Sequence, residues 1–144
     1  PTELTANGWL SPDPSTAIRK KRRFTFEQLP ESERSETSFR LLKQCGELSV
    51  VEAIPRTGRL HQIRATLFSL GYPMTGDKLY GVDDSFFTKF IDDRLTEDDR
   101  NRLLLPRQAL HASELRVPFR GGELHASAPL PDDMAALCGD LSGE

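Results

Sequence analysis

One arginine, Arg64, falls beside the apolar stripe of a predicted helix, where a charged side chain needs a partner. The helix is expected over about residues 59–70, because Thr57 and Gly58 can cap and turn the chain into it and Gly71 can end it. At about 100° per residue, the stripe consists of Leu60, Ile63, Leu67 and Leu70. A guanidinium keeps its proton at neutral pH, so burying it requires a carboxylate or phosphate in good geometry.

Two interpretations of Arg64 follow from the helix alone. The side chain can lay its stem over the core and keep its head in water, as long cationic side chains often do. Alternatively, it pairs with an acidic group, keeps that group ionised and fixes its orientation, as an active site requires. Arg59 and Gln62 point away from the stripe, so their polar ends are expected to meet solvent or a phosphate. His61 also points away and is interpreted as structural.

The order of residues around Arg64 forms a longer pattern. The chain reads Thr-Gly-Arg-Leu-His-Gln-Ile-Arg over residues 57–64 and Gly-Tyr-Pro-Met-Thr-Gly-Asp-Lys-Leu-Tyr-Gly over residues 71–81. This order resembles the C-terminal signature of the RluA-type pseudouridine synthases almost residue for residue. The resemblance continues more weakly through residues 107–112 and 128–134, so it covers roughly the whole chain.

The resemblance implies an enzyme that isomerises uridine to pseudouridine in ribosomal or transfer RNA without a cofactor. The uridine is flipped out of its stack, an aspartate attacks or activates it, the bond between the ribose and N1 breaks, and the base rotates and rejoins the ribose through C5. In the family the last arginine of the signature, matched here by Arg64, pairs with that aspartate. Arg59 and Gln62 are weaker candidates for contacts with the pocket or the RNA backbone, and Asp77 and Tyr80 are expected to hold a turn.

The nucleophile of the family has no match in this chain. It stands in a His-Arg-Leu-Asp motif that precedes the signature, and this tetrapeptide does not occur in the 144 residues. We therefore expect the C-terminal portion of a catalytic domain, which needs the missing N-terminal half as a partner and is inactive alone. The rival interpretation is a non-catalytic RNA- or partner-binding module with the same fold. Among the acidic residues, only Asp77 is placed to act as a substitute nucleophile.

A run of five cations over residues 19–23 precedes the alternating Phe24, Thr25 and Phe26 of a predicted strand. Two functions fit the run equally well: solvated cations deter edge-to-edge pairing of sheets, and clustered cations bind an RNA backbone. The candidates for RNA binding are Lys20, Lys21, Arg22 and Arg23. A net charge of −3 argues against nucleic-acid binding over the entire surface, and the acidic segment 83–99 would repel RNA.

Other kinds of site have little support in the sequence. No two of the three histidines are spaced for one helix face, so no metal site is expected. Cys45 and Cys138 are isolated, which implies no disulfide framework and makes a reducing cytoplasm the default compartment. No serine elbow or cysteine–histidine pairing predicts a hydrolase, and no long apolar run predicts a membrane helix.

The remaining elements predict a single α+β unit with a mixed, mainly antiparallel sheet and flanking helices. Residues 1–18, with Gly8, Pro12 and Pro14, indicate an irregular entry, and the charged residues 27–36 indicate a loop. A hairpin over 37–43 and 48–54 should pack against the Arg64 helix. Two short helices within 86–105 are expected to cover the sheet. Strands over 108–119 and 123–127 and a helix from Pro131 complete the prediction.

Overall fold

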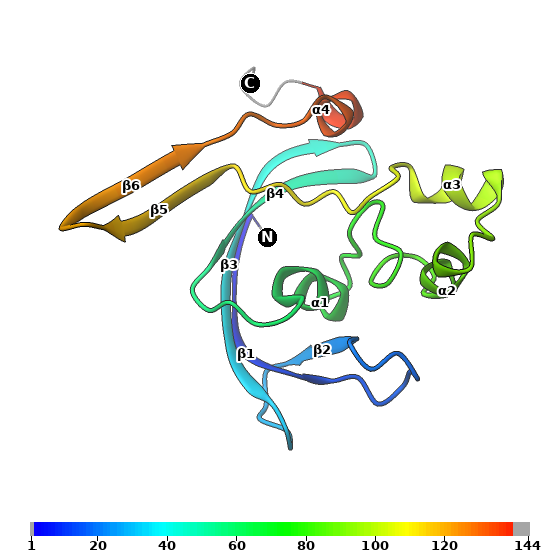
Figure 1. Ribbon diagram of the computed structural model, residues 1–144, viewed down its shortest axis with the longest axis horizontal. Coiled ribbons are helices and arrows are strands. Elements are labelled where there is room, and N and C mark those ends of the chain that lie inside the picture. The colour runs from blue at the N-terminus through cyan, green and yellow to red at the C-terminus, as the bar shows by residue number, and fades with distance from the viewer. Residues whose placement is uncertain (1, 140–144) are drawn as a thin grey trace.

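Four antiparallel strands form the main sheet of the computed structural model, which describes residues 2–139 (Figure 1). Their order across the sheet is β2-β1-β3-β4, and every pairing is antiparallel. The strands are β1 (Glu3–Pro12), β2 (Arg22–Thr25), β3 (Glu33–Cys45) and β4 (Leu48–Pro55). The predicted hairpin is therefore confirmed as β3–β4, and β2 begins within the basic run as expected.

The first strand corrects the expectation of an irregular entry segment. Leu4, Ala6, Gly8 and Leu10 alternate along β1 and turn toward the interior, which is the period-two pattern of a half-buried strand. The small residues at 6 and 8 weaken this pattern in the sequence. Gly8 is needed because a Cβ there would collide with the carbonyl oxygen of Thr25 and the ring of Phe24.

Helix α1 (Gln62–Ser69) packs against one face of this sheet. The core between them consists of Ala6, Leu10, Phe24, Phe39, Ala65, Leu79 and Tyr80. Burying these side chains is the main source of stability for the unit, at roughly 25 cal/mol per Å² of apolar surface. The helix therefore rests on apolar side chains from three strands and from the segment that follows it.

The start of α1 differs from the prediction, whereas its end agrees. The helix begins at Gln62, not near residue 59, because His61 adopts the left-handed conformation with φ 56° and breaks the helical path. Leu60 is consequently outside the helix and 46% exposed, so it is not part of the buried stripe. At the C-terminus, Gly71 N–H donates to the Phe68 carbonyl and Tyr72 N–H to the Leu67 carbonyl, as in a Schellman motif.

Helices α2 (Ser85–Ile91) and α3 (Glu97–Leu103) confirm the two predicted helices but not their position. They lie beyond α1, at the side of the molecule, and do not cover the sheet (Figure 1). Thr96 and Asp99 form a reciprocal capping box at the start of α3, as the sequence predicted. Asp99 is consequently buried, and it is not part of a solvated acidic face.

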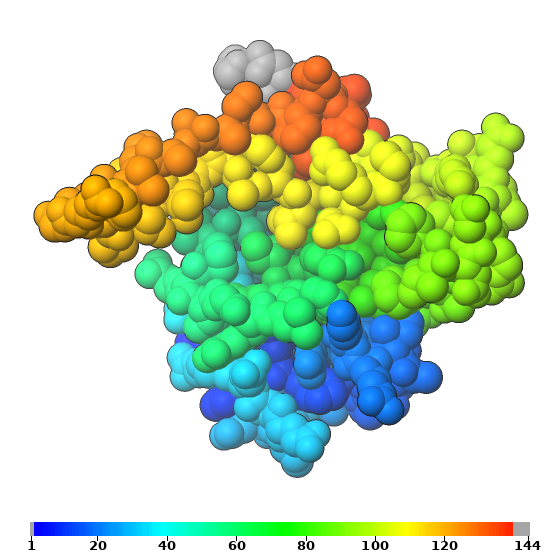
Figure 2. All heavy atoms as spheres, viewed as in Figure 1, coloured from blue at the N-terminus to red at the C-terminus, as the bar shows by residue number. Residues whose placement is uncertain are grey.

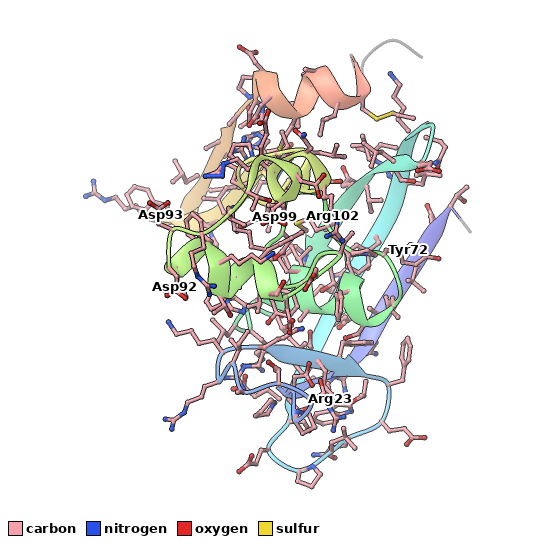
Figure 3. The ribbon with its side chains drawn as sticks, turned by 90° about the vertical axis from the view of Figure 1, so that its right-hand side faces the viewer. Arg23, Tyr72, Asp92, Asp93, Asp99 and Arg102 are labelled. Atoms are coloured by element: carbon pink, nitrogen blue, oxygen red, sulfur yellow. A yellow bond between two sulfur atoms is a disulfide. The ribbon has the colours of Figure 1, made fainter. Side chains whose placement is uncertain are left out.

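A second, two-stranded sheet pairs β5 (Glu114–Phe119) with β6 (Gly122–Ser127), and the chain then enters α4 (Asp132–Cys138). The predicted strand over 108–119 is thus shorter than expected. The hairpin extends outward from the body of the molecule (Figure 2). A disulfide joins Cys45 at the end of β3 to Cys138 of α4, which corrects the expectation that the cysteines are isolated (Figure 3).

The structure is α+β, as predicted, with both sheets antiparallel across the described residues. None of the helices within residues 2–139 has the length and apolar character needed to cross a membrane.

Candidate active site

Arg64 on α1 forms a two-pronged ion pair with Asp77, which lies in the turn after the helix. Its Nε donates to one carboxylate oxygen at 2.7 Å and its Nη2 to the other at 2.9 Å. Asp77 is completely buried, and the Arg64 side chain is only 16% exposed. The interpretation that Arg64 keeps its head in water is therefore wrong. Its burial is balanced by a carboxylate in the parallel geometry that a guanidinium favours.

The turn that carries Asp77 is built around its side chain. One carboxylate oxygen also accepts the backbone N–H groups of Leu79 and Tyr80, at 3.0 and 2.9 Å. Gly76 has φ 75°, and a Cβ there would collide with the carbonyl of Arg107, so only glycine fits before the aspartate. Asp77 thus holds the turn, as expected. Its burial and four hydrogen bonds leave it no access to a substrate, which excludes it as a substitute nucleophile.

The ion pair determines the charge of both groups. Burial alone would raise the pKa of Asp77, but the Arg64 hydrogen bonds and the backbone N–H of Tyr80 outweigh it, so this pKa lies below its ordinary value. The hydrogen bonds to Asp77 also raise the pKa of Arg64. Arg64 and Asp77 are therefore both charged at neutral pH, and the guanidinium is fixed in one orientation.

One side of the Arg64 guanidinium is not used by this pair. Asp77 engages Nε and Nη2, whereas Nη1 has no hydrogen-bond partner among residues 2–139. Nη1 is also absent from the buried side-chain atoms that lack a partner, so it reaches the protein surface. The carbon of the guanidinium stacks 5.0 Å from the centre of the Tyr80 ring. The arrangement can therefore hold Arg64 rigidly and still present N–H donors to a second anion.

Tyr80 joins the helix to the second strand. It is fully buried, and its hydroxyl accepts the backbone N–H of Arg22 at 2.8 Å and lies 2.9 Å from Nδ1 of His61. Burial raises the pKa of the Tyr80 phenol. Tyr80 thus holds β2, the start of α1 and the Arg64–Asp77 pair together, a role wider than the turn that the sequence predicted.

Gln62 does not face solvent, contrary to the expectation. It is 5% exposed, and its side-chain oxygen accepts from the Thr57 hydroxyl and the Arg59 backbone N–H. Its side-chain nitrogen donates to the Glu36 carbonyl and the Thr37 hydroxyl. The amide is saturated by the protein and ties the start of α1 to β3. The physical reason for the error is that α1 buries the face that carries Gln62, Ala65 and Thr66, whereas the predicted stripe placed Gln62 on the outer side.

Arg59 is exposed and borders a hollow on the surface. The hollow is lined by Leu10, Arg22, Glu31, Glu33, Arg59 and Leu60. Nε of Arg59 donates to the backbone carbonyl of Arg34 at 2.9 Å, which fixes the side chain along the rim. The position of Arg59 is compatible with its predicted contact to an RNA backbone, although two glutamates share the lining.

The basic run divides into exposed and buried members. Lys20 is exposed, and Arg22 and Arg23 are half-buried. Lys21 is only 6% exposed: its ammonium pairs with Asp84 at 3.2 Å and lies 5.0 Å from the centre of the Phe68 ring. Lys21 directly precedes β2, and its side chain packs against Phe68 of α1. The run is therefore not five equivalent surface cations, and Lys21 is a packing residue.

Two residues of this region had no assigned chemistry in the sequence. Tyr80 links three elements, and His61 combines a left-handed backbone with a hydrogen bond to a buried phenol. No helix periodicity signals either role, because both lie outside the helix. Their only sequence signal is their place in the motif around Arg64. Across residues 2–139 no cluster of three or more histidine, cysteine or acidic side chains is arranged to hold a metal ion.

Curated relatives of the chain are RNA pseudouridine synthases. The ribosomal large subunit pseudouridine synthase D of Nitrosomonas europaea is 42% identical over 103 residues, which are 70% of this chain and 27% of that protein. The protein of the same name from Vibrio cholerae is 32% identical over 136 residues, or 93% of this chain and 40% of that protein. The chain thus spans well under half the length of these relatives. No family model matches it.

Solved structures agree with these relatives. The human RNA pseudouridylate synthase domain containing 1 superposes with a TM-score of 0.67 at 25% identity, covering 90% of this chain and 49% of that chain. The human RNA pseudouridylate synthase domain containing 4 superposes with a TM-score of 0.61 at 21% identity. At this identity the likeness supports the assignment of the fold and nothing more.

Proposed function

Because the chain belongs to the RluA-type pseudouridine synthase family, we propose that it is the C-terminal portion of a catalytic domain that isomerises uridine in RNA. In this proposal the chain supplies the positioning side of the active centre. The nucleophilic aspartate comes from the part of the domain that the chain lacks. The RNA is ribosomal or transfer RNA, and the reaction needs no cofactor because it only moves a glycosidic bond from N1 to C5.

The observation that carries the proposal is the half-used guanidinium of Arg64. Asp77 holds its Nε and Nη2, and Nη1 reaches the surface without a partner among the described residues. A second carboxylate docked on this side would be stabilised as an anion, because a fixed nearby cation lowers its pKa. It would also be fixed in orientation, since the guanidinium itself cannot rotate away from Asp77.

The two carboxylates would then have separate tasks. Asp77 is buried, fully hydrogen-bonded and serves to aim Arg64. The incoming aspartate would face the flipped uridine and act on it. Base flipping delivers the uridine to such a pocket, where exclusion of water strengthens the pairing of Arg64 with the nucleophile.

The proposal also includes the binding partners of the chain and its cellular compartment. The missing N-terminal half of the domain would be the protein partner, and RNA the substrate. The cytoplasm is the compartment that we propose. The Cys45–Cys138 disulfide is unusual for it, because disulfides are rare in cytoplasmic proteins.

Substitution of Arg64 in the complete protein tests the proposal. Arg64→Lys should lower the rate of pseudouridine formation by about a hundredfold or more, because a lysine cannot form parallel hydrogen bonds to one carboxylate while facing another. Formation of pseudouridine is measured in an unmodified RNA substrate, with circular dichroism as the check on folding. A folded Arg64→Lys variant with the wild-type rate would contradict the orienting role.

The double variant Arg64→Met with Asp77→Asn serves as the control for stability. Arg64→Met alone would leave Asp77 as an unpaired buried charge and destabilise the fold, whereas the double variant removes both charges. A folded double variant should also lack activity, which separates loss of the guanidinium from loss of structure.

A further inference from the structure

The phenol of Tyr80 determines where the His61 ring carries its proton. Its oxygen already accepts the backbone N–H of Arg22 at 2.8 Å, and it is fully buried, so its own proton has to be donated to a partner. Nδ1 of His61, at 2.9 Å, is the only acceptor available to it among the hydrogen bonds of residues 2–139. Assigned from this network, His61 is neutral and carries its proton on Nε2.

The Nε2–H group of His61 is available at the surface. No hydrogen bond engages Nε2 within the described part of the chain, and Nε2 is not one of the buried side-chain atoms without a partner. Burial, together with the positive charge of Arg64, lowers the pKa of His61, which favours the same neutral ring. His61 therefore presents a fixed, uncharged hydrogen-bond donor.

The backbone of His61 holds this donor in place. With φ 56° it occupies the left-handed region, which few residues other than glycine, asparagine, aspartate and histidine adopt. The conformation and the hydrogen bond to Tyr80 together fix both the position of the ring and its tautomer.

The charges around His61 indicate the kind of ligand that it faces. Arg64, Arg22 and Lys20 lie close enough to influence the ring, and Asp77 opposes them from the turn. Asp77 and Arg64 compensate each other, whereas Arg22 and Lys20 form no ion pair within residues 2–139, so the net charge around the ring is positive. The cations would attract a negatively charged polymer such as RNA, and the neutral N–H group can donate to one of its oxygen atoms.

We propose that His61 contacts the RNA substrate directly, donating its Nε2–H to an oxygen of the nucleotide that enters beside Arg64. The acceptor is a phosphate oxygen or a uracil carbonyl oxygen, which offer the same chemistry to the donor. This inference rests on the proposed function, because it takes RNA as the ligand, and it adds a residue with a defined tautomer to the binding site.

Two substitutions in the 144-residue chain separate the RNA contact from the structural role. His61→Asn keeps an acceptor near Nδ1 and tolerates the left-handed backbone, but it removes the Nε2–H donor. His61→Gln keeps a donor near Nε2 and loses the acceptor for Tyr80. RNA affinity is measured by fluorescence anisotropy with a stem-loop that carries one loop uridine, and the melting temperature is measured in parallel.

We expect His61→Asn to melt close to the wild-type chain and to bind the RNA about 3- to 10-fold more weakly, the effect of one hydrogen bond. His61→Gln should melt at a lower temperature and keep more of the affinity. Equal affinities of the wild-type chain and His61→Asn would overturn the inference while leaving the proposed function intact. A wild-type chain that does not bind the stem-loop would also overturn the inference, whereas the proposed function is judged by pseudouridine formation with both halves of the domain present.

The tautomer and the source of the acceptor are tested separately. Long-range proton–nitrogen correlation spectra of the histidine rings should show the His61 proton on Nε2, and a proton on Nδ1 would overturn the inference. Repeating the affinity measurement with an abasic site in place of the loop uridine identifies the acceptor. If the acceptor is the uracil, His61→Asn and the wild-type chain should bind the abasic RNA with equal affinity. If the acceptor is a phosphate, His61→Asn should still bind it more weakly.

Discussion

The region around Arg64 and the β5–β6 hairpin differ in what they bury. The first buries polar groups, and the second exposes apolar ones. Around Arg64, a buried charge, a buried phenol and a buried amide each find their partners within the chain. The hairpin leaves its apolar face uncovered by any described part of the chain: Leu115 and Phe119 are each 53% exposed.

The strand register shows that the apolar residues of the hairpin gather on one face. Val117 pairs with Leu124 and Phe119 with Gly122, and the residues of such pairs share one face. Arg116 lies on the other face, where it contacts Glu114 and Glu123. The chain thus supplies partners for the buried Asp77, Tyr80 and Gln62 around Arg64, whereas the hairpin is amphipathic and has no covered core. Stability should therefore depend strongly on the first region and weakly on the second.

The largest effect is expected for Asp77→Asn. The substitution leaves Arg64 largely buried without a counter-charge, so the free energy of unfolding should fall by about 3–5 kcal/mol. Urea denaturation at neutral pH measures the change. Asp92→Asn is the matched control: its pair with Arg94 is exposed at the outer turn after α2 (Figure 3), and its loss should cost less than about 1 kcal/mol.

The pH dependence of the same pair sharpens this prediction. Because the folded pKa of Asp77 is lowered, its stabilising contribution is present above the unfolded pKa and is lost as the pH falls through the folded pKa. The difference in stability between the wild-type chain and Asp77→Asn should therefore shrink in acid. A difference that stays constant down to the acid limit would show that Asp77 does not act through its charge.

An intermediate effect separates two adjacent lysines. Lys21→Ser should lower the free energy of unfolding by about 1–2 kcal/mol, because it removes a buried ammonium from Asp84 and from the Phe68 ring. Lys20→Ser should leave stability unchanged and flatten the dependence of RNA binding on salt by about 0.7 in log–log slope. If Lys20→Ser and the wild-type chain show the same dependence of RNA affinity on salt, the exposed cations of the run do not contact RNA. Their role would then be to deter edge-to-edge pairing of sheets.

The smallest effect is expected in the hairpin. Phe119→Ala should change the free energy of unfolding by less than about 0.5 kcal/mol, since half of the ring is already in water. Phe86→Ala is the matched comparison and should cost about 3–5 kcal/mol, because that ring is fully buried. Similar costs for the two phenylalanines would contradict the weak contribution of the hairpin to stability.

Local signals in the sequence predicted much of the fold. The hairpin β3–β4, the capping box at Thr96, the end of α1 at Gly71 and the β5–β6 turn all depend on residues near one another in the chain. Strand β1 was missed because small residues weaken its alternation. The start of α1 was placed too early because the left-handed backbone of His61 has no signature in helix periodicity.

The site was predictable in its central residue and not in its partners. The inward arginine requires a carboxylate on physical grounds, but helix geometry cannot say that Asp77, 13 positions later, returns to meet it. Gln62 and Lys21 were assigned to the surface because their burial depends on where β2 and β3 lie against α1. The pairing of Cys45 with Cys138 likewise depends on the docking of α4, which no spacing in the sequence reveals.

Complementation tests the central claim, that this chain positions a nucleophile which it does not contain. The purified chain is incubated with a panel of unmodified RNAs, first alone and then with the N-terminal half of the domain, and pseudouridine is measured. Pseudouridine is expected only when both halves are present. Pseudouridine formed by the chain alone would contradict this expectation.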